Sequence, residues 1–164
     1  MCGAGFCNGA GICGVCKPGD ARCIGNRPET CNASGSWSPA SDCGAVAPVC
    51  SAGACVGVKS AAAGSGTCVL LDDGTVRCWG MKVSGVFATT PTPVTGVSMV
   101  VDLAVGQGFV CAARSVGPVL CWGANDSGQL GQGVTGPGSD VPQPVSGTDG
   151  AVQVSAGFAS VCAV

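Results

Sequence analysis

Cysteine is the residue type that could do most chemistry in this chain, which contains 14 cysteines and no histidine. Without histidine, neither a Ser-His-Asp triad nor a Cys-His pair can be assembled. A C-x-x-C motif occurs at Cys13 and Cys16, and such a pair can form half of a zinc site or a redox couple. No imidazole is present to complete a mixed zinc site, and no βαβ pattern surrounds the motif. We therefore interpret both cysteines as members of a disulfide mesh with different partners.

Adjacent oxygen-bearing side chains raise the alternative of a calcium site. They occur at Asp72-Asp73 and at Asn125-Asp126. The spacing matches no calcium-binding loop, and turn chemistry explains Asp and Asn at these places. Two adjacent carboxylates on an exposed turn are also poorly placed for a raised pKa. We expect no catalytic residue, no metal and no cofactor, and we interpret the chain as a non-enzyme.

The composition indicates an oxidising compartment and argues against nucleic acid as a partner. Fourteen cysteines in 164 residues are typical of a disulfide scaffold in a secreted protein. The net charge is −2 and neither half is basic, whereas nucleic-acid binding needs clustered Lys and Arg. No stretch is long and apolar enough for a membrane span. The N-terminus does not resemble a signal peptide, so an extracellular or cell-surface location implies an export signal upstream of Met1.

Cysteine density divides the chain into two parts, with nine cysteines in residues 1–55 and five in the rest. We predict a cysteine-rich module at residues 1–57, dominated by loops, and a different domain at residues 58–164. The phrase C-x-A-G-x-C occurs at residues 2–7 and again at residues 50–55. If the phrase closes a module, residues 1–7 are the tail of a preceding copy.

The stretch CKPGDARCIGNRPETCNASGSWSPASDC resembles small cysteine-rich repeats of secreted bacterial multidomain proteins. This resemblance implies no activity. Within the stretch, Trp37 is the large apolar side chain that we expect the small module to bury. A contact with sugar is the alternative role for this indole.

The second part contains one phrase twice, TCVLLDDGTVRCWG at residues 67–80 and VCAARSVGPVLCWG at residues 110–123. In each copy a three-residue turn signal ends in glycine, and strand residues flank it. Counting outward from the two unlike turns gives the same result, because the cysteines fall opposite each other. Directly opposed residues of an antiparallel pair can meet disulfide distances. We therefore predict two cross-strand disulfides, Cys68–Cys78 and Cys111–Cys121.

A third copy, GFASVCAV at residues 157–164, stops after its first cysteine, Cys162. The first cysteines of successive copies are 43 and 51 residues apart, which fits one four-stranded propeller blade per repeat. The incomplete third copy and the orphan phrase at residues 2–7 lead us to expect a fragment that is truncated at both ends. A bond from Cys162 to the N-terminal part is the alternative.

The best-preserved repeat, residues 105–133, contains the string C-W-G-x-N-x-x-GQLG-x-G. This string resembles the regulator-of-chromosome-condensation (RCC-type) repeat family over about residues 58–164. The family folds as a seven-bladed β-propeller, so the resemblance implies an all-β chain with about two blades of a larger ring. Two departures are evident. Phe109 and Ser160 stand where the family has histidine, and MKVSGVFATT (81–90) replaces the GQLG stretch in the first copy.

The residues of the repeat could have either a structural or a functional role. The tryptophans could stack on a ligand and the GQLG stretch could line a binding rim. Their recurrence at fixed repeat positions favours packing between blades and a structural turn. The residues that we assign to the repeat framework are Trp79, Gly80, Trp122, Gly123, Gly128, Gln129, Leu130 and Gly131.

Three functions stay open at this point. The first is a non-catalytic, secreted or cell-surface binding module whose partner is another protein. The second is an accessory region of a larger secreted enzyme. The third is a protein inhibitor of a secreted enzyme. The family includes a nucleotide-exchange factor and a secreted β-lactamase inhibitor, and this resemblance favours protein–protein contact.

Overall fold

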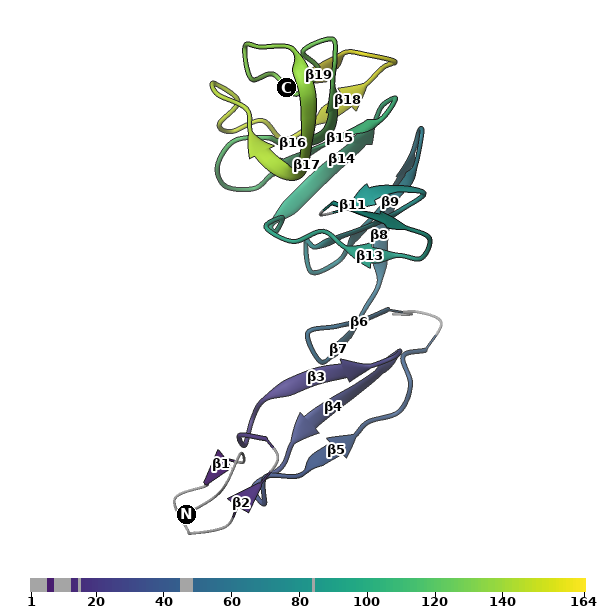
Figure 1. Cartoon of the computed structure of the whole chain (residues 1–164). Helices are drawn as coiled ribbons and strands as arrows, with labels where there is room; N and C mark the ends of the chain where they lie inside the picture. Colours follow the sequence, from purple (N-terminus) through teal and green to yellow (C-terminus); the bar gives the residue numbers. More distant parts are fainter. Residues whose placement is uncertain (1–5, 8–12, 15, 45–48, 84) are drawn as a thin grey trace. The chain divides into compact units, whose positions relative to one another are not determined.

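Short β-strands and turns account for the architecture of this chain, and the described residues contain no helix. The computed structural model describes residues 6–7, 13–14, 16–44, 49–83 and 85–164 (Figure 1). Two compact units divide the chain, Met1–Val58 and Lys59–Val164. The proposed tail of a preceding module lies largely outside the described residues. No helix in the described ranges is long and apolar enough to cross a membrane.

The N-terminal unit consists of small antiparallel sheets held together by disulfides. A three-stranded sheet has the order β3–β4–β5, and two-stranded pairs lie before and after it. The strands are β1 (Phe6–Cys7), β2 (Cys13–Gly14), β3 (Ala21–Ile24), β4 (Arg27–Cys31), β5 (Trp37–Pro39), β6 (Val49–Ser51) and β7 (Ala54–Val56). The disulfides in the described part of this unit are Cys16–Cys31, Cys23–Cys50 and Cys43–Cys55.

Two four-stranded antiparallel sheets, called the first and second blades below, form most of the C-terminal unit. The first blade comprises β8 (Val58–Ala63), β9 (Thr67–Leu71), β10 (Val76–Trp79) and β13 (Thr92–Pro93). The second comprises β14 (Val100–Val105), β15 (Phe109–Arg114), β16 (Leu120–Asn125) and β17 (Gly136–Pro144). A hairpin of β11 (Met81–Val83) and β12 (Val86–Ala88) lies in sequence between β10 and β13. The unit ends with a third hairpin, β18 (Val154–Ala156) and β19 (Val161–Ala163).

Apolar side chains fill the spaces between successive blades. Five consecutive residues of β15 are buried, because alternate side chains point to opposite faces of a strand and both faces of this blade are covered. Val110 and Ala112 join the cluster shared with the first blade, whereas Phe109 and Cys111 join the cluster that includes Val154 of the third hairpin. The second blade is therefore packed on both sides.

A polar contact also ties the second blade to the third hairpin. The backbone N–H of Val154 donates to Oδ2 of Asp102 over 2.9 Å. Asp102 interrupts the apolar run of β14, and this bond gives its carboxylate a partner.

Candidate interaction surface

Both repeated hairpins have the register that brings their cysteines face to face. Cys68 pairs with Cys78 and Cys111 with Cys121 in the strand register. The Cα atoms of these pairs lie 4.1 Å and 4.2 Å apart, which is close to the narrow, non-hydrogen-bonded spacing of antiparallel strands. Both pairs are disulfide-bonded and fully buried. The four sulfurs are part of the packed clusters between blades, where a reductant in solution cannot reach them.

The two tryptophans occupy equivalent places but are buried to different degrees. Trp122 is 1% exposed and lies in the cluster between the first and second blades. Its indole N–H has no hydrogen-bond partner among the described residues. Trp79 is half-buried and packs at the margin of the same cluster. The structure therefore places both indoles at packing positions.

The glycine after each tryptophan also differs between the copies. Gly123 has φ +107°, and a Cβ there would overlap the backbone carbonyl oxygen of Gly108. Gly80 has φ +73°, and a Cβ there would meet only Gly66 Cα at 3.6 Å. Backbone atoms cannot move aside as a flexible side chain can. The second repeat thus depends on glycine for close approach of two strands, whereas the first depends on it only for conformation.

We expect Gly123→Ala to lower the free energy of unfolding by about 2 kcal/mol, and Gly80→Ala by about 1 kcal/mol. The larger effect follows from the collision with the Gly108 carbonyl, added to the strain of a positive φ. Urea unfolding monitored by tryptophan fluorescence measures both values. Equal losses for the two variants would show that the close approach at Gly123 does not matter.

The GQLG stretch satisfies its own polar groups. Asn125 is buried, and its side-chain oxygen accepts from the Leu130 N–H while its NH₂ group donates to the Val134 carbonyl. The Gln129 side-chain oxygen accepts from the Ser127 N–H, and Leu130 is 1% exposed. Gly128 and Gly131 close consecutive backbone turns. The stretch is a hydrogen-bonded turn that carries one core leucine, and few of its polar groups are left for a ligand.

The other residues considered for metal binding or redox chemistry also make local structural bonds. Cys16 of the C-x-x-C motif bonds to Cys31, whereas the side chain of Cys13 lies outside the described residues. Asp73 accepts hydrogen bonds from the backbone N–H and the hydroxyl of Thr75, as in an Asx turn. Within the described ranges, no group of three or more His, Cys, Asp or Glu residues is arranged to hold a metal ion.

The segment in which the first copy departs from the repeat lies beside a cavity. This segment contains the β11–β12 hairpin, and β11 contacts β17 of the second blade. Lys82 Nζ lies 3.9 Å from Asp140 Oδ2, an ion pair between the hairpin and β17. A cavity of about 380 Å³ lies at this junction. Its lining includes Met81, Lys82, Phe87, Trp122, Pro137 and Asp140.

Two large apolar side chains of β12 are exposed, and one of them, Phe87, lines this cavity. Val86 is 69% exposed and Phe87 is 64% exposed, both on β12. Val141 on β17 is 57% exposed. We did not predict these residues from the sequence, because we treated the segment only as a departure from the GQLG stretch. The signal was present in the string VSGVF, where apolar residues flank a glycine turn.

Comparisons with known proteins agree with this geometry. Residues 117–164 match the model of the regulator of chromosome condensation (RCC1) repeat. The structure is similar to Prp20p of Saccharomyces cerevisiae, with a TM-score of 0.58 and 20% identity over 66% of this chain and 31% of that one. It is also similar to human WBSCR16, with a TM-score of 0.58 and 25% identity over 65% and 30% of the two chains. A search of curated proteins found no match.

The chain contains a partial β-propeller. It spans 31% and 30% of the lengths of the two solved structures, and its successive sheets pack face to face as blades do. The all-β class and the propeller repeats that the sequence predicted are confirmed. The secreted bacterial type and the identity of the preceding cysteine-rich module stay predictions.

Proposed function

We propose that this chain is a non-catalytic binding module of a secreted or cell-surface protein, and that its partner is another protein. The observation that carries the proposal is the pair Val86 and Phe87, exposed on a hairpin that replaces a structural turn of the repeat. Exposed aromatic and aliphatic side chains around a cavity are typical of protein-binding surfaces. The framework residues of the second repeat, by contrast, are used in packing and in internal hydrogen bonds.

Two further observations support this function. Five disulfides occur among the described residues, which supports an oxidising location outside the cell. The solved structure of Prp20p is described together with binding to Gsp1p and histones. We take from that protein only the use of a propeller as a platform for protein partners.

We expect Phe87→Ser to reduce capture of a protein partner from the culture medium of the source organism by about fivefold or more. Phe158→Ser is the matched control, because Phe158 is 76% exposed but lies in the third repeat and does not line the cavity. Immobilising the 164-residue chain and identifying the captured proteins by mass spectrometry measures the effect. Equal losses for the two variants, or capture that neither variant changes, would remove the β11–β12 hairpin as the binding surface.

A further inference from the structure

The β6–β7 hairpin covers one face of the three-stranded sheet of the N-terminal unit, and the Cys16–Cys31 disulfide lies on part of the other face. The β6–β7 hairpin contacts both β3 and β4. The Gly53 N–H donates to Cys23 Sγ over 3.3 Å, and Cys23 bonds to Cys50 of β6. Because side chains alternate along a strand, the face that carries Cys23 is the one that this hairpin covers. The residues next to Cys23 in β3 therefore belong to the other face.

The strand register gathers two arginines and a tryptophan on that other face. Arg22 pairs with Glu29, Ile24 with Arg27, and Cys31 with Trp37. Directly paired residues share a face, and so do residues two apart in one strand. The name arginine face is used below for Arg22, Ile24, Arg27, Glu29 and Trp37.

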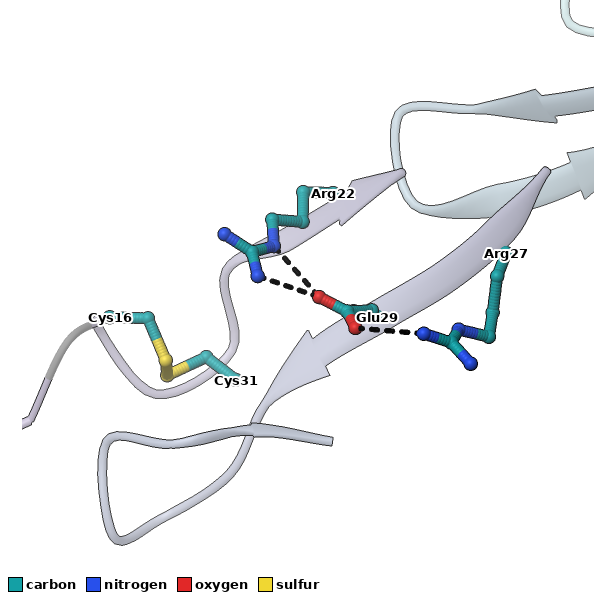
Figure 2. Close-up of polar contacts among 5 residues, drawn as sticks. All are labelled: Cys16, Arg22, Arg27, Glu29 and Cys31. Atoms are coloured by element: carbon teal, nitrogen blue, oxygen red, sulfur yellow. Dashed lines mark hydrogen bonds and ion pairs between the residues drawn. A yellow bond between two sulfur atoms is a disulfide. The ribbon is translucent and has the colours of Figure 1, made fainter. Parts of the chain in front are cut away.

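Charge on the arginine face does not cancel. Glu29 is 8% exposed and lies between the two guanidinium groups, as Figure 2 shows. Its Oε2 accepts from Arg22 Nε over 2.9 Å and lies 2.7 Å from Arg22 Nη2, whereas its Oε1 is 3.9 Å from Arg27 Nη2. Two cations thus share one carboxylate. The other acids of this unit in the described ranges, Asp20 and Asp42, form no ion pair with either arginine, so the face has a surplus positive charge in a chain of net charge −2.

Arg22 is held in place before any ligand arrives. Its guanidinium carbon lies 4.1 Å from the centroid of the Trp37 ring, a cation–π contact, while Glu29 holds its edge. Trp37 is half-buried under this arginine, so the expectation of a buried indole is corrected. A fixed guanidinium loses little rotamer freedom on binding.

Donors on both arginines are left for a partner. Figure 2 shows the third nitrogen of the Arg22 guanidinium pointing away from Glu29, and Arg27 reaching Glu29 with one nitrogen only. The side chains of both arginines are 44% exposed. Arginine forks match the two oxygens of a carboxylate, so an acidic group is the ligand that they fit.

We propose that the arginine face binds an acidic segment of a protein partner, with a carboxylate on Arg27 and Arg22 and an apolar neighbour on Ile24. Ile24 is 48% exposed beside the two cations. Arg and Trp are enriched at the centres of protein interfaces, where a buried apolar contact accompanies the charge pairing. This site is independent of the β11–β12 hairpin, and either surface can fail its test while the other stands.

The test uses the full chain and a labelled probe peptide of alternating Glu and Val, with a Gln-and-Val peptide as the matched probe. Fluorescence anisotropy should detect binding of the Glu peptide only, and added salt should weaken it. Arg27→Ala should weaken binding about fivefold, and Arg27→Glu should abolish it. Lys59→Ala is the control for a cation elsewhere, since Lys59 is exposed on β8. Equal binding of the two peptides, or binding that Arg27→Glu does not change, would overturn the proposal.

A second measurement needs no variant and covers the case in which Arg27→Ala misfolds. In the ¹⁵N spectrum of the wild-type chain, the Nε–H signals of Arg22 and Arg27 should shift as the Glu peptide is added. Unshifted arginine signals at saturating peptide would refute the site. Binding of a sulfated polysaccharide at these signals, with none of the peptide, would refute the choice of a protein partner.

Discussion

Trp122→Ala should lower the free energy of unfolding of the C-terminal unit by about 3–5 kcal/mol. The indole is 1% exposed in the core between two blades, so its removal leaves a cavity that rigid strands cannot close. Trp79→Ala should cost only about 1–2 kcal/mol, because the equivalent indole is half-buried. Urea unfolding followed by circular dichroism measures both variants without relying on the fluorescence of the residue removed.

Trp122→Phe separates packing from hydrogen bonding at this position. The indole N–H has no partner among the described residues, so phenylalanine removes an unsatisfied donor while keeping most of the apolar contact. We expect a loss of about 1 kcal/mol. A loss as large as that of Trp122→Ala would mean that the N–H makes an essential bond. Equal losses for Trp79→Ala and Trp122→Ala would contradict the difference in burial between the two indoles.

Replacing both cysteines of the second hairpin, Cys111→Ala with Cys121→Ala, should lower the free energy of unfolding by about 3 kcal/mol. The chain-entropy model gives nearly this value for a loop closed over ten residues, and the buried sulfurs add lost packing. The Cys68 and Cys78 pair should behave alike, since it has the same separation and burial. Cys162→Ala is the control, because this thiol is free and exposed and its loss should change stability by less than about 0.5 kcal/mol.

Peptide mapping of the non-reduced chain has to accompany these measurements. It should recover Cys68 linked to Cys78 and Cys111 linked to Cys121. A different partner for any of these four cysteines would refute the hairpin geometry itself. If the linkages are correct but the double variant keeps the same free energy of unfolding, the disulfide does not stabilise the blade.

Much of the C-terminal unit could be predicted because its signals are local. A hairpin register depends on the turn and on residues a few positions away, so counting outward from Asp72-Asp73-Gly74 gives the same pairs as the strands do. The repeat then carries the blade architecture from one copy to the next. The all-β propeller class followed from these two facts.

The β11–β12 hairpin and the arginine face depend on contacts that no short window contains. Whether Phe87 is exposed depends on how residues 81–90 lie against β17, a strand some fifty residues away. The stacking of Arg22 on Trp37 needs the three strands to pair in the correct order. The disulfide partners of the cysteines in the N-terminal unit also depend on contacts between distant residues, because many pairings are possible for nine cysteines.

Cys50 and Cys55 face each other across β6–β7, as the cysteines of the propeller hairpins do, yet Cys50 bonds to Cys23 and Cys55 to Cys43. The propeller bridges can therefore close as soon as each hairpin forms, in any order. In the N-terminal unit, the native bonds instead require Cys23 of β3 and Cys43 to approach the β6–β7 hairpin. We therefore expect the disulfides of the two units to form by different routes. A Cys50–Cys55 bond that formed first would have to be exchanged for the Cys23–Cys50 and Cys43–Cys55 bonds, whereas the propeller hairpins need no such exchange.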